Sequence, residues 1–124
     1  MLRGLRGATT IEENTELEIV DATEKLMREL ITINEVMAEN VASVFLSVTE
    51  DIDAAFPAKA LRRLEGWTHV PVMCMREIPV ANSLKKCIRV MVHMNTDKKQ
   101  TEIKHVYLEK ALILRPDLNN EIEK

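Results

Sequence analysis

Apolar and polar residues alternate along the segment KKCIRVMVHM, residues 85–94. One set of alternate positions is wholly apolar and consists of Ile88, Val90, Val92 and Met94. A period of two residues is typical of a β-strand, so the pattern predicts a strand over residues 86–95. The other set contains Arg89, which places a guanidinium near the middle of an otherwise apolar strand. That arginine needs a physical explanation, because burying an unpaired charge is costly.

A segment earlier in the chain, up to about residue 34, has the apolar period of an α-helix. Asn14 or Thr15 can cap a helix that continues to about residue 34, and the glutamates near its start suit the positive end of the helix dipole. The apolar stripe on one face consists of Leu17, Val20, Met27, Leu30 and Ile31, with Ile19 and Leu26 at its edge. We expect this stripe to pack on a sheet.

The remaining apolar runs are shorter. Residues 41–49 indicate a buried strand. Residues 67–75 indicate an edge or irregular strand, because Pro71 cannot donate a hydrogen bond to a neighbouring strand. Residues 51–66 indicate a loop that enters a short helix, with Pro57 in its first turn.

The two ends of the chain are harder to interpret. Residues 1–10 indicate a short strand and a turn, with Gly7 as the break. Residues 103–116 fit either a strand or an amphipathic turn, and we favour the strand. Together the elements predict one α/β (α+β) domain over residues 1–118, with a mixed β-sheet packed on helices, and a mobile tail over residues 119–124.

Charge is unevenly distributed along the chain. The net charge is −3, but residues 11–53 hold 12 acids and 2 bases, whereas residues 54–115 hold 5 acids and 12 bases. The simpler interpretation is a solvated acidic helix followed by ordinary mixed charge, and the alternative is that the second half binds an anion. Aromatic residues are few and no basic run is interleaved with them, so nucleic acid is not an expected partner.

The two cysteines, Cys74 and Cys87, have no pairing motif, and the histidines do not fall at metal-ligand spacings. We therefore expect neither a disulfide framework nor a metal site, and the cytoplasm is the simplest location. The longest apolar runs are far short of a membrane span, and the first residues lack the apolar region of a signal peptide.

Three residues are candidates for chemistry, and each has two interpretations. Arg89 either lies on a half-buried face and pairs with a surface acid, or it is a fixed donor for an anion or a developing oxyanion. Glu77 is most simply a surface carboxylate, although it could orient a hydroxyl. Cys74 is more simply a small buried hydrophobic residue than a nucleophile.

Five stretches of the chain carry a resemblance to a known family. They are RGLRGATT (3–10), FPAKALR (56–62), GWTHVPVMCMREI (66–78), LKKCIRVMV (84–92) and HVYLEKALILRPDL (105–118). In this order and spacing they resemble the AroH class of monofunctional chorismate mutases. The resemblance implies a trimer of α/β subunits whose sheets form a pseudo-barrel, with active sites in clefts between adjacent subunits. It also implies that chorismate is rearranged to prephenate without a cofactor or metal.

The resemblance further implies roles for individual residues. Arg89 would face the ether oxygen of chorismate, and Glu77 would accept a hydrogen bond from the ring hydroxyl, with Cys74 beside it. The residues implied to bind substrate are Arg6, Phe56, Ala58, Lys59, Arg62, Val72, Met73, Tyr107, Leu114 and Arg115. Met73 departs from the family pattern, in which a smaller polar residue is expected, so we expect activity to survive and affinity to change. Phe56 to Arg62 are expected from one subunit and Arg89 from its neighbour.

Two other functions remain open on the sequence. A trimeric binding or regulatory module could sense an aromatic-pathway anion with the same basic residues, but it would not need Arg89 and Glu77 as a pair. An imine deaminase of the RidA type would need an arginine clamp and an activated water, and it would not require Cys74, Glu77 and Arg89 together.

Overall fold

The computed structural model describes residues 1–114 of the 124-residue chain. The expected tail over residues 119–124 lies outside the described residues. A five-stranded sheet has the strand order β3-β2-β4-β1-β5. The strands are β1 (Leu2–Thr10), β2 (Val41–Val48), β3 (Val72–Arg76), β4 (Cys87–Asn95) and β5 (Val106–Tyr107). The helices are α1 (Glu16–Asn34) and the 3-10 helices η1 (Ala38–Asn40), η2 (Pro57–Arg63), η3 (Gln100–Glu102) and η4 (Glu109–Leu114).

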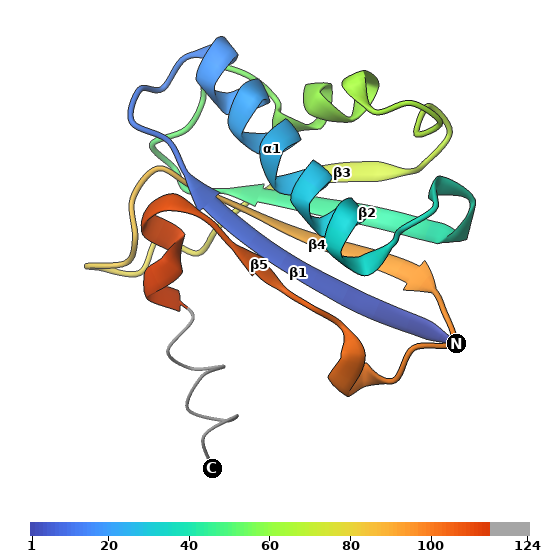
Figure 1. Cartoon of the computed structure of the whole chain (residues 1–124). Coiled ribbons are helices and arrows are strands. Elements are labelled where there is room, and N and C mark those ends of the chain that lie inside the picture. Colours follow the sequence, from blue (N-terminus) through green and yellow to red (C-terminus); the bar gives the residue numbers. More distant parts are fainter. Residues whose placement is uncertain (115–124) are drawn as a thin grey trace.

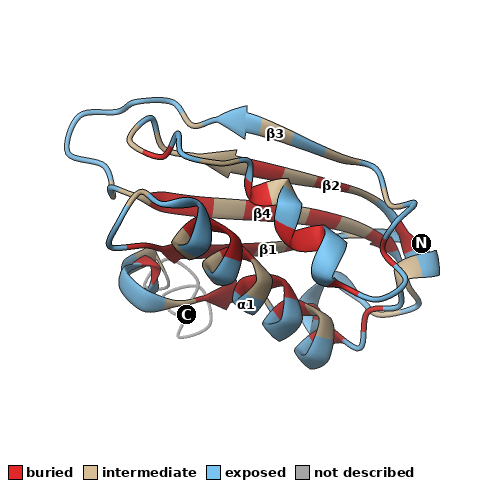
Figure 2. Cartoon of the chain, turned by 90° about the horizontal axis from the view of Figure 1, so that it is seen from above, coloured by how far each residue is buried: buried red, intermediate tan, exposed pale blue. Residues whose placement is uncertain are grey.

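The sheet is mixed, as predicted. The central strand β4 runs antiparallel to both of its neighbours, β1 and β2, whereas the outer pairs β2–β3 and β1–β5 are parallel. Figure 1 shows α1 and η2 lying on the same side of this sheet. Seen from above, both lie over the strands and β3 forms an exposed edge (Figure 2). The prediction of a mixed sheet packed on helices is therefore confirmed. Of the strand predicted over residues 67–75, only the part from Val72 onward is an edge strand; the prediction was wrong for residues 67–71, because Pro71 cannot donate a hydrogen bond to β2.

The long helix begins and ends where the sequence predicts. The Thr15 hydroxyl accepts a hydrogen bond from the Glu18 backbone N–H at 3.2 Å, which caps the first turn of α1. The Glu18 carboxylate in turn accepts from the backbone N–H groups of Glu12 and Glu13. The helix ends at Glu35, whose φ of 54° is left-handed.

The buried face of α1 is rotated from the predicted stripe. Ile19 and Leu26, placed at the edge by the sequence pattern, are fully buried, whereas Leu17 is 66% exposed. Leu17 lies about 120° around the helix from the buried Thr23, so it points away from the sheet. The prediction that Leu17 faces the core was therefore wrong.

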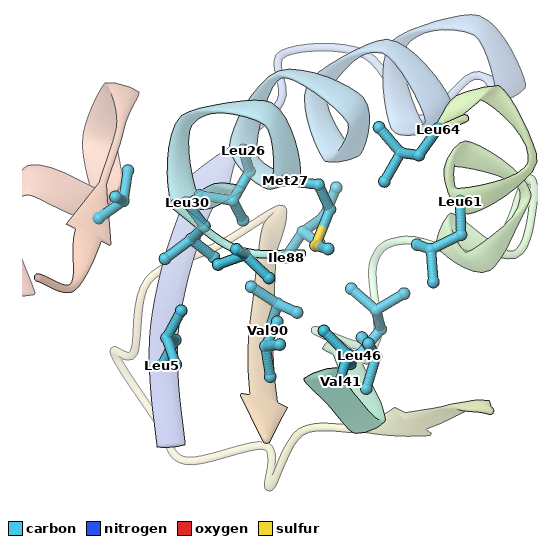
Figure 3. Close-up of a cluster of buried hydrophobic side chains, with 14 of the residues drawn as sticks. Leu5, Leu26, Met27, Leu30, Val41, Leu46, Leu61, Leu64, Ile88 and Val90 are labelled. Atoms are coloured by element: carbon cyan, nitrogen blue, oxygen red, sulfur yellow. The ribbon is translucent and has the colours of Figure 1, made fainter. Parts of the chain in front are cut away.

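One hydrophobic core lies between the sheet and the helices. In the close-up of Figure 3, Leu26, Met27 and Leu30 of α1 face side chains of three strands, and η2 closes one side. The other labelled side chains are Leu5, Val41, Leu46, Ile88 and Val90 of the strands, Leu61 of η2, and Leu64, which directly follows η2. In β4 the alternation holds, because Ile88, Val90, Val92 and Met94 are all buried in this core.

The first strand is longer than predicted, and Gly7 does not break it. β1 pairs with β4 without interruption from Leu2 opposite Asn95 to Thr10 opposite Cys87. A Cβ atom at Gly7 would lie 3.0 Å from Leu30 Cδ1, so a side chain there would collide with α1. The glycine is a point of close approach between helix and sheet, which is why it sits inside a strand.

Most of the described part of the strand predicted over residues 103–116 is not a strand, so this prediction was wrong except at two residues. Only Val106–Tyr107 forms a strand, parallel to β1. Glu109 then adopts a left-handed φ of 51°, and η4 follows over Glu109–Leu114. β5 is this short because the left-handed Glu109 cannot continue a strand.

The face of the sheet opposite α1 carries the charged candidates. Arg89 lies opposite Ser47 on one side and Ala8 on the other, and Ala8 lies opposite Tyr107. Residues that are directly paired in a sheet point to the same face, so Arg89, Ser47 and Tyr107 share it. Within residues 1–114, no helix has the length and apolar character needed to cross a membrane.

Candidate functional site

Arg89 occupies the centre of the sheet and has an acidic partner. Its Nη1 atom lies 3.9 Å from Oε1 of Glu77, which directly follows β3. The Ser47 hydroxyl donates a hydrogen bond to the other carboxylate oxygen of Glu77. The Arg89 side chain is 40% exposed, so its charge is balanced on one side and remains open to solvent on the other. Arg89 is therefore a positioned donor with room for a second anionic partner.

A pocket of about 930 Å³ opens beside this pair. Glu77 and Arg89 line it together with Cys87 and Leu114. Its other charged lining residues are Glu12, Lys85, Lys86 and Lys110. Four bases thus face two acids, and this excess of positive charge favours a small anion. Such a volume is typical of a small-molecule site.

A small buried cluster forms the base of this region. Ala8, Cys87, Tyr107 and Ala111 pack together, and Leu84 and Leu114 pack against them. Burial raises the pKa of the Cys87 thiol to about 11, and the nearby Arg89 charge only partly offsets this effect. Cys87 is therefore a neutral thiol at pH 7 and serves as an apolar wall rather than a nucleophile.

Arg6 lies on the same face of the sheet, two residues before Ala8 on β1. Its Nε atom is buried and has no hydrogen-bond partner among residues 1–114. The Arg6 backbone N–H is satisfied, because it donates to Nδ1 of His105 at 3.0 Å. Burial, and then the Arg6 charge, lower the pKa of His105, so the ring is neutral at pH 7 and can accept this bond. An unpartnered buried guanidinium nitrogen is costly and points to an acceptor supplied from outside these residues.

Another set of predicted site residues lies elsewhere on the chain. Phe56, Lys59 and Cys74 line a separate pocket of about 520 Å³. Cys74 pairs with the buried Leu46, so its side chain points to the α1 face and away from that of Arg89. Lys59 is held by a 3.0 Å ion pair with Glu16.

The remaining predicted site residues are also divided between the α1 side of the sheet and the face that carries Arg89. Val72 and Ala58 pack against the main core, and Arg62 is exposed on η2. Met73 is 61% exposed on the face that carries Arg89, opposite Phe45. Arg115 lies outside the described residues. A single chain thus brings Glu77, Arg89, Tyr107 and Leu114 together, and it leaves the residues of η2 and Cys74 in a second group.

Comparison with known proteins identifies the family. The chain matches the family model described as chorismate mutase type I over residues 2–118. The chain belongs to this family. It is 53% identical to the chorismate mutase AroH of Bacillus subtilis strain 168 over 96% of the chain and 94% of that protein. It is 45% identical to the chorismate mutase AroH of Thermus thermophilus over 97% of the chain and 98% of that protein.

A solved structure is similar over nearly its whole length. A chorismate mutase from Clostridium thermocellum aligns with a TM-score of 0.86 and 51% identity, covering 89% of this chain and 97% of that one. The recognition made from five sequence stretches is therefore confirmed, and so is the fold class.

Sequence reasoning missed two residues of this candidate site. Ser47 contacts Glu77, and Thr49 lines the pocket. A signal for Ser47 was present, because Ser43 and Ser47 are four residues apart in β2 and so lie on the same face of the strand. Two serines on one face indicate that this face is partly open, whereas residues 41–49 were predicted as a buried strand.

Proposed function

We propose that this protein catalyses the rearrangement of chorismate to prephenate, a step towards phenylalanine and tyrosine. Membership of the chorismate mutase type I family supports the reaction. The observation that best supports the position of the active site is the Arg89–Glu77 pair at the wall of a basic pocket. Chorismate carries two carboxylates, so an excess of lysine and arginine around the pocket suits it.

Arg89 is the residue that lowers the barrier in this proposal. The reaction breaks a C–O bond and forms a C–C bond in one pericyclic step, and negative charge builds on the ether oxygen. A preorganised donor aimed at such an oxygen contributes roughly 3–4 kcal/mol to transition-state stabilisation. The partial exposure of Arg89 leaves its guanidinium accessible to this oxygen. No general acid, base or nucleophile is required.

The other residues hold the substrate in a reactive shape. Glu77, oriented by Ser47, accepts a hydrogen bond from the ring hydroxyl. Arg6 and Tyr107, on the same face of the sheet as Arg89, bind carboxylates. Fixing the side chain over the ring removes part of the entropic barrier. We propose that no cofactor or metal takes part.

We propose further that the protein is a homotrimer with its sites between adjacent subunits. Two observations support this assembly. Glu77 and Arg89 line one pocket of the chain, whereas Phe56, Lys59 and Cys74 line another. A neighbouring subunit is therefore needed to bring the two sets of residues into one site. The Arg89 face also exposes Met73 and Met75, which a partner would cover. Both cysteines are free thiols, in keeping with our proposal of a cytoplasmic location.

The first experiment measures the loss of chorismate absorbance with the purified protein and with two variants. We expect rapid conversion to prephenate by the wild type and none above background by Arg89→Ala. Arg89→Lys should lose most of kcat, because lysine cannot place the same fork of donors. Near-normal turnover of Arg89→Lys would refute the electrostatic mechanism. A wild type that binds chorismate without converting it would instead favour the binding module.

A mixing experiment tests the shared site. Arg89→Ala and Lys59→Ala are each expected to be impaired. If each site takes Arg89 from one subunit and Lys59 from the next, every mixed trimer contains one native site. Random mixing of equal amounts should then restore about a quarter of wild-type sites. Activity that never exceeds that of the better single variant would contradict a shared site.

A further inference from the structure

Side chains from the segment after β2 hold the start of β4. Both carboxylate oxygens of Asp51 accept from the Lys86 backbone N–H, at 3.1 and 3.0 Å. The Thr49 hydroxyl donates to Asp51 Oδ1 at 2.5 Å and accepts from the Cys87 backbone N–H at 3.0 Å. The first strand residue and the one before it are therefore both fixed by this pair of side chains.

Lys86 adopts a conformation that lysine does not favour. Its φ of 46° is left-handed, where the Cβ atom makes the backbone unfavourable for residues other than glycine. The backbone oxygen of Lys86 accepts from the Ile11 N–H at 3.0 Å, so the peptide is held on both sides. A strained residue of this kind persists only where its surroundings enforce it. Asp51 supplies the acceptors on the side of β2.

The same segment also holds the other end of the loop. The Glu77 backbone N–H donates to the Val48 carbonyl at 2.9 Å, and Thr49 and Asp51 follow directly in sequence. Residues 48–51 thus anchor Glu77 at the start of the loop and Lys86 at its end. Arg89 comes three residues after Lys86, and its guanidinium lies 3.9 Å from the Glu77 carboxylate. The separation of this pair therefore depends on both anchors.

We propose that Asp51 is a positioning residue for Arg89. This inference rests on the proposed function. Asp51 is not among the residues that line the pocket beside Arg89. It holds Lys86 in the left-handed turn from which β4 starts, and that turn sets the direction in which the Arg89 side chain leaves the strand. A small shift at the start of β4 would change where the Arg89 side chain points, because successive side chains of a strand point to opposite faces of the sheet.

The ionisation of Asp51 agrees with this arrangement. Partial burial alone would raise its pKa, but the hydrogen bonds from Thr49 and from the Lys86 backbone outweigh burial, and the pKa lies below its ordinary value. The Lys86 charge acts in the same direction. Asp51 is therefore an anion at neutral pH, which strengthens its bonds to the two donors.

The test compares the kinetics of Asp51→Ala and Asp51→Asn with those of the wild type. Displacing the donor to the transition state should lower kcat of Asp51→Ala roughly tenfold. The KM should stay within about twofold, since Arg6 and Lys59 lie on other elements. Asp51→Asn keeps one acceptor for Lys86 and should lose less. The matched control is Asp97→Asn, an exposed aspartate in the turn at the other end of β4, which should leave kcat unchanged.

A rescue separates positioning from a general loss of stability. Lys86→Gly removes the steric penalty of the left-handed conformation, so adding Asp51→Ala to Lys86→Gly should lower kcat by no more than about twofold, compared with roughly tenfold in the wild-type background. The reference for the double variant is the Lys86→Gly single variant, because Lys86 itself lines the pocket. Amide hydrogen exchange provides a readout that does not need turnover. Exchange at Lys86, Cys87 and Arg89 should be faster in Asp51→Ala and near normal in Asp97→Asn.

Wild-type turnover tests the proposed function, whereas the Asp51 variants test the positioning role. A wild type without turnover ends the proposed function, while exchange at residues 86–89 still decides whether Asp51 holds the strand. Unchanged kcat in a folded Asp51→Ala would overturn the positioning role. So would a loss of kcat that Lys86→Gly does not relieve, or unchanged exchange at residues 86–89. If Asp51→Ala does not fold, Asp51→Asn takes its place in each comparison.

Discussion

Replacing Arg6 with methionine should separate the binding of substrate from the stability of the fold. The Nε atom of Arg6 is buried without a hydrogen-bond partner among residues 1–114. Arg3, on the same strand, provides the matched control, because its Nε donates to the Lys98 carbonyl at 3.2 Å. If Arg6 awaits a substrate carboxylate, Arg6→Met and Arg3→Met should have opposite effects.

The expected magnitudes follow from these contacts. Methionine keeps the apolar stem of arginine and removes an unsatisfied donor, so the free energy of unfolding of Arg6→Met should stay the same or rise by up to about 1 kcal/mol. The loss of a charged hydrogen bond to a carboxylate costs about 1.5–3 kcal/mol of binding. That loss corresponds to a KM raised roughly ten- to 150-fold, with kcat little changed because Arg89 is untouched. Arg3→Met should lose about 1 kcal/mol of stability at unchanged KM.

Steady-state kinetics with chorismate and urea unfolding at a fixed protein concentration give both quantities. A role of Arg6 in binding substrate is refuted if Arg6→Met loses about 2 kcal/mol of stability while its KM stays at the wild-type value. That result would make Arg6 a structural residue with an acceptor inside the folded protein.

Two further predictions concern packing and thiol chemistry. Gly7→Ala should lower the free energy of unfolding by about 1–3 kcal/mol, because the new methyl group would lie 3.0 Å from Leu30 Cδ1. In the control Gly4→Ala, the new methyl group would meet only the sulfur of the half-exposed Met91, at 3.2 Å, so the free energy of unfolding should change by less than about 0.5 kcal/mol. Equal losses of stability for the two variants in urea denaturation would contradict the close approach of α1 at Gly7. At pH 8 a thiol reagent should modify the half-exposed Cys74 first, because a pKa near 11 leaves about one Cys87 in a thousand as thiolate. Rapid modification of Cys87 in the folded Cys74→Ser variant would show that its thiol is not buried as described.

Elements with a strong local period could be predicted from the sequence. The alternation around Arg89 and the cap at Thr15 are local signals, and both β4 and α1 follow them closely. The roles of the site residues came instead from the family resemblance, because their spacing along the chain carries no chemical signature. Arg6, Glu77 and Arg89 belong to different segments, and only sheet pairing brings two of them to one face.

Elements whose cause lies far away in the chain could not be predicted. Gly7 looks like a turn residue, and its real reason is the methyl group of Leu30 on α1. Val106 and Tyr107 form a strand because β1, about a hundred residues earlier, offers them a free edge. The pocket residue Cys74 was expected beside Glu77, but side-chain alternation along β3 turns it to the other face of the sheet.

The order of strands in the sheet has a consequence for how the protein is made. β1 is synthesised before the other strands of the sheet, yet both of its neighbours, β4 and β5, come from residues 87–107. While the chain grows on the ribosome, the N-terminal strand and the face of α1 that packs on it have no complete sheet to join. Chains terminated before β4 would expose apolar surface and a strand edge, the features that lead nascent proteins to aggregate. The sheet around β1 can therefore be completed only after β4 and β5 have been translated.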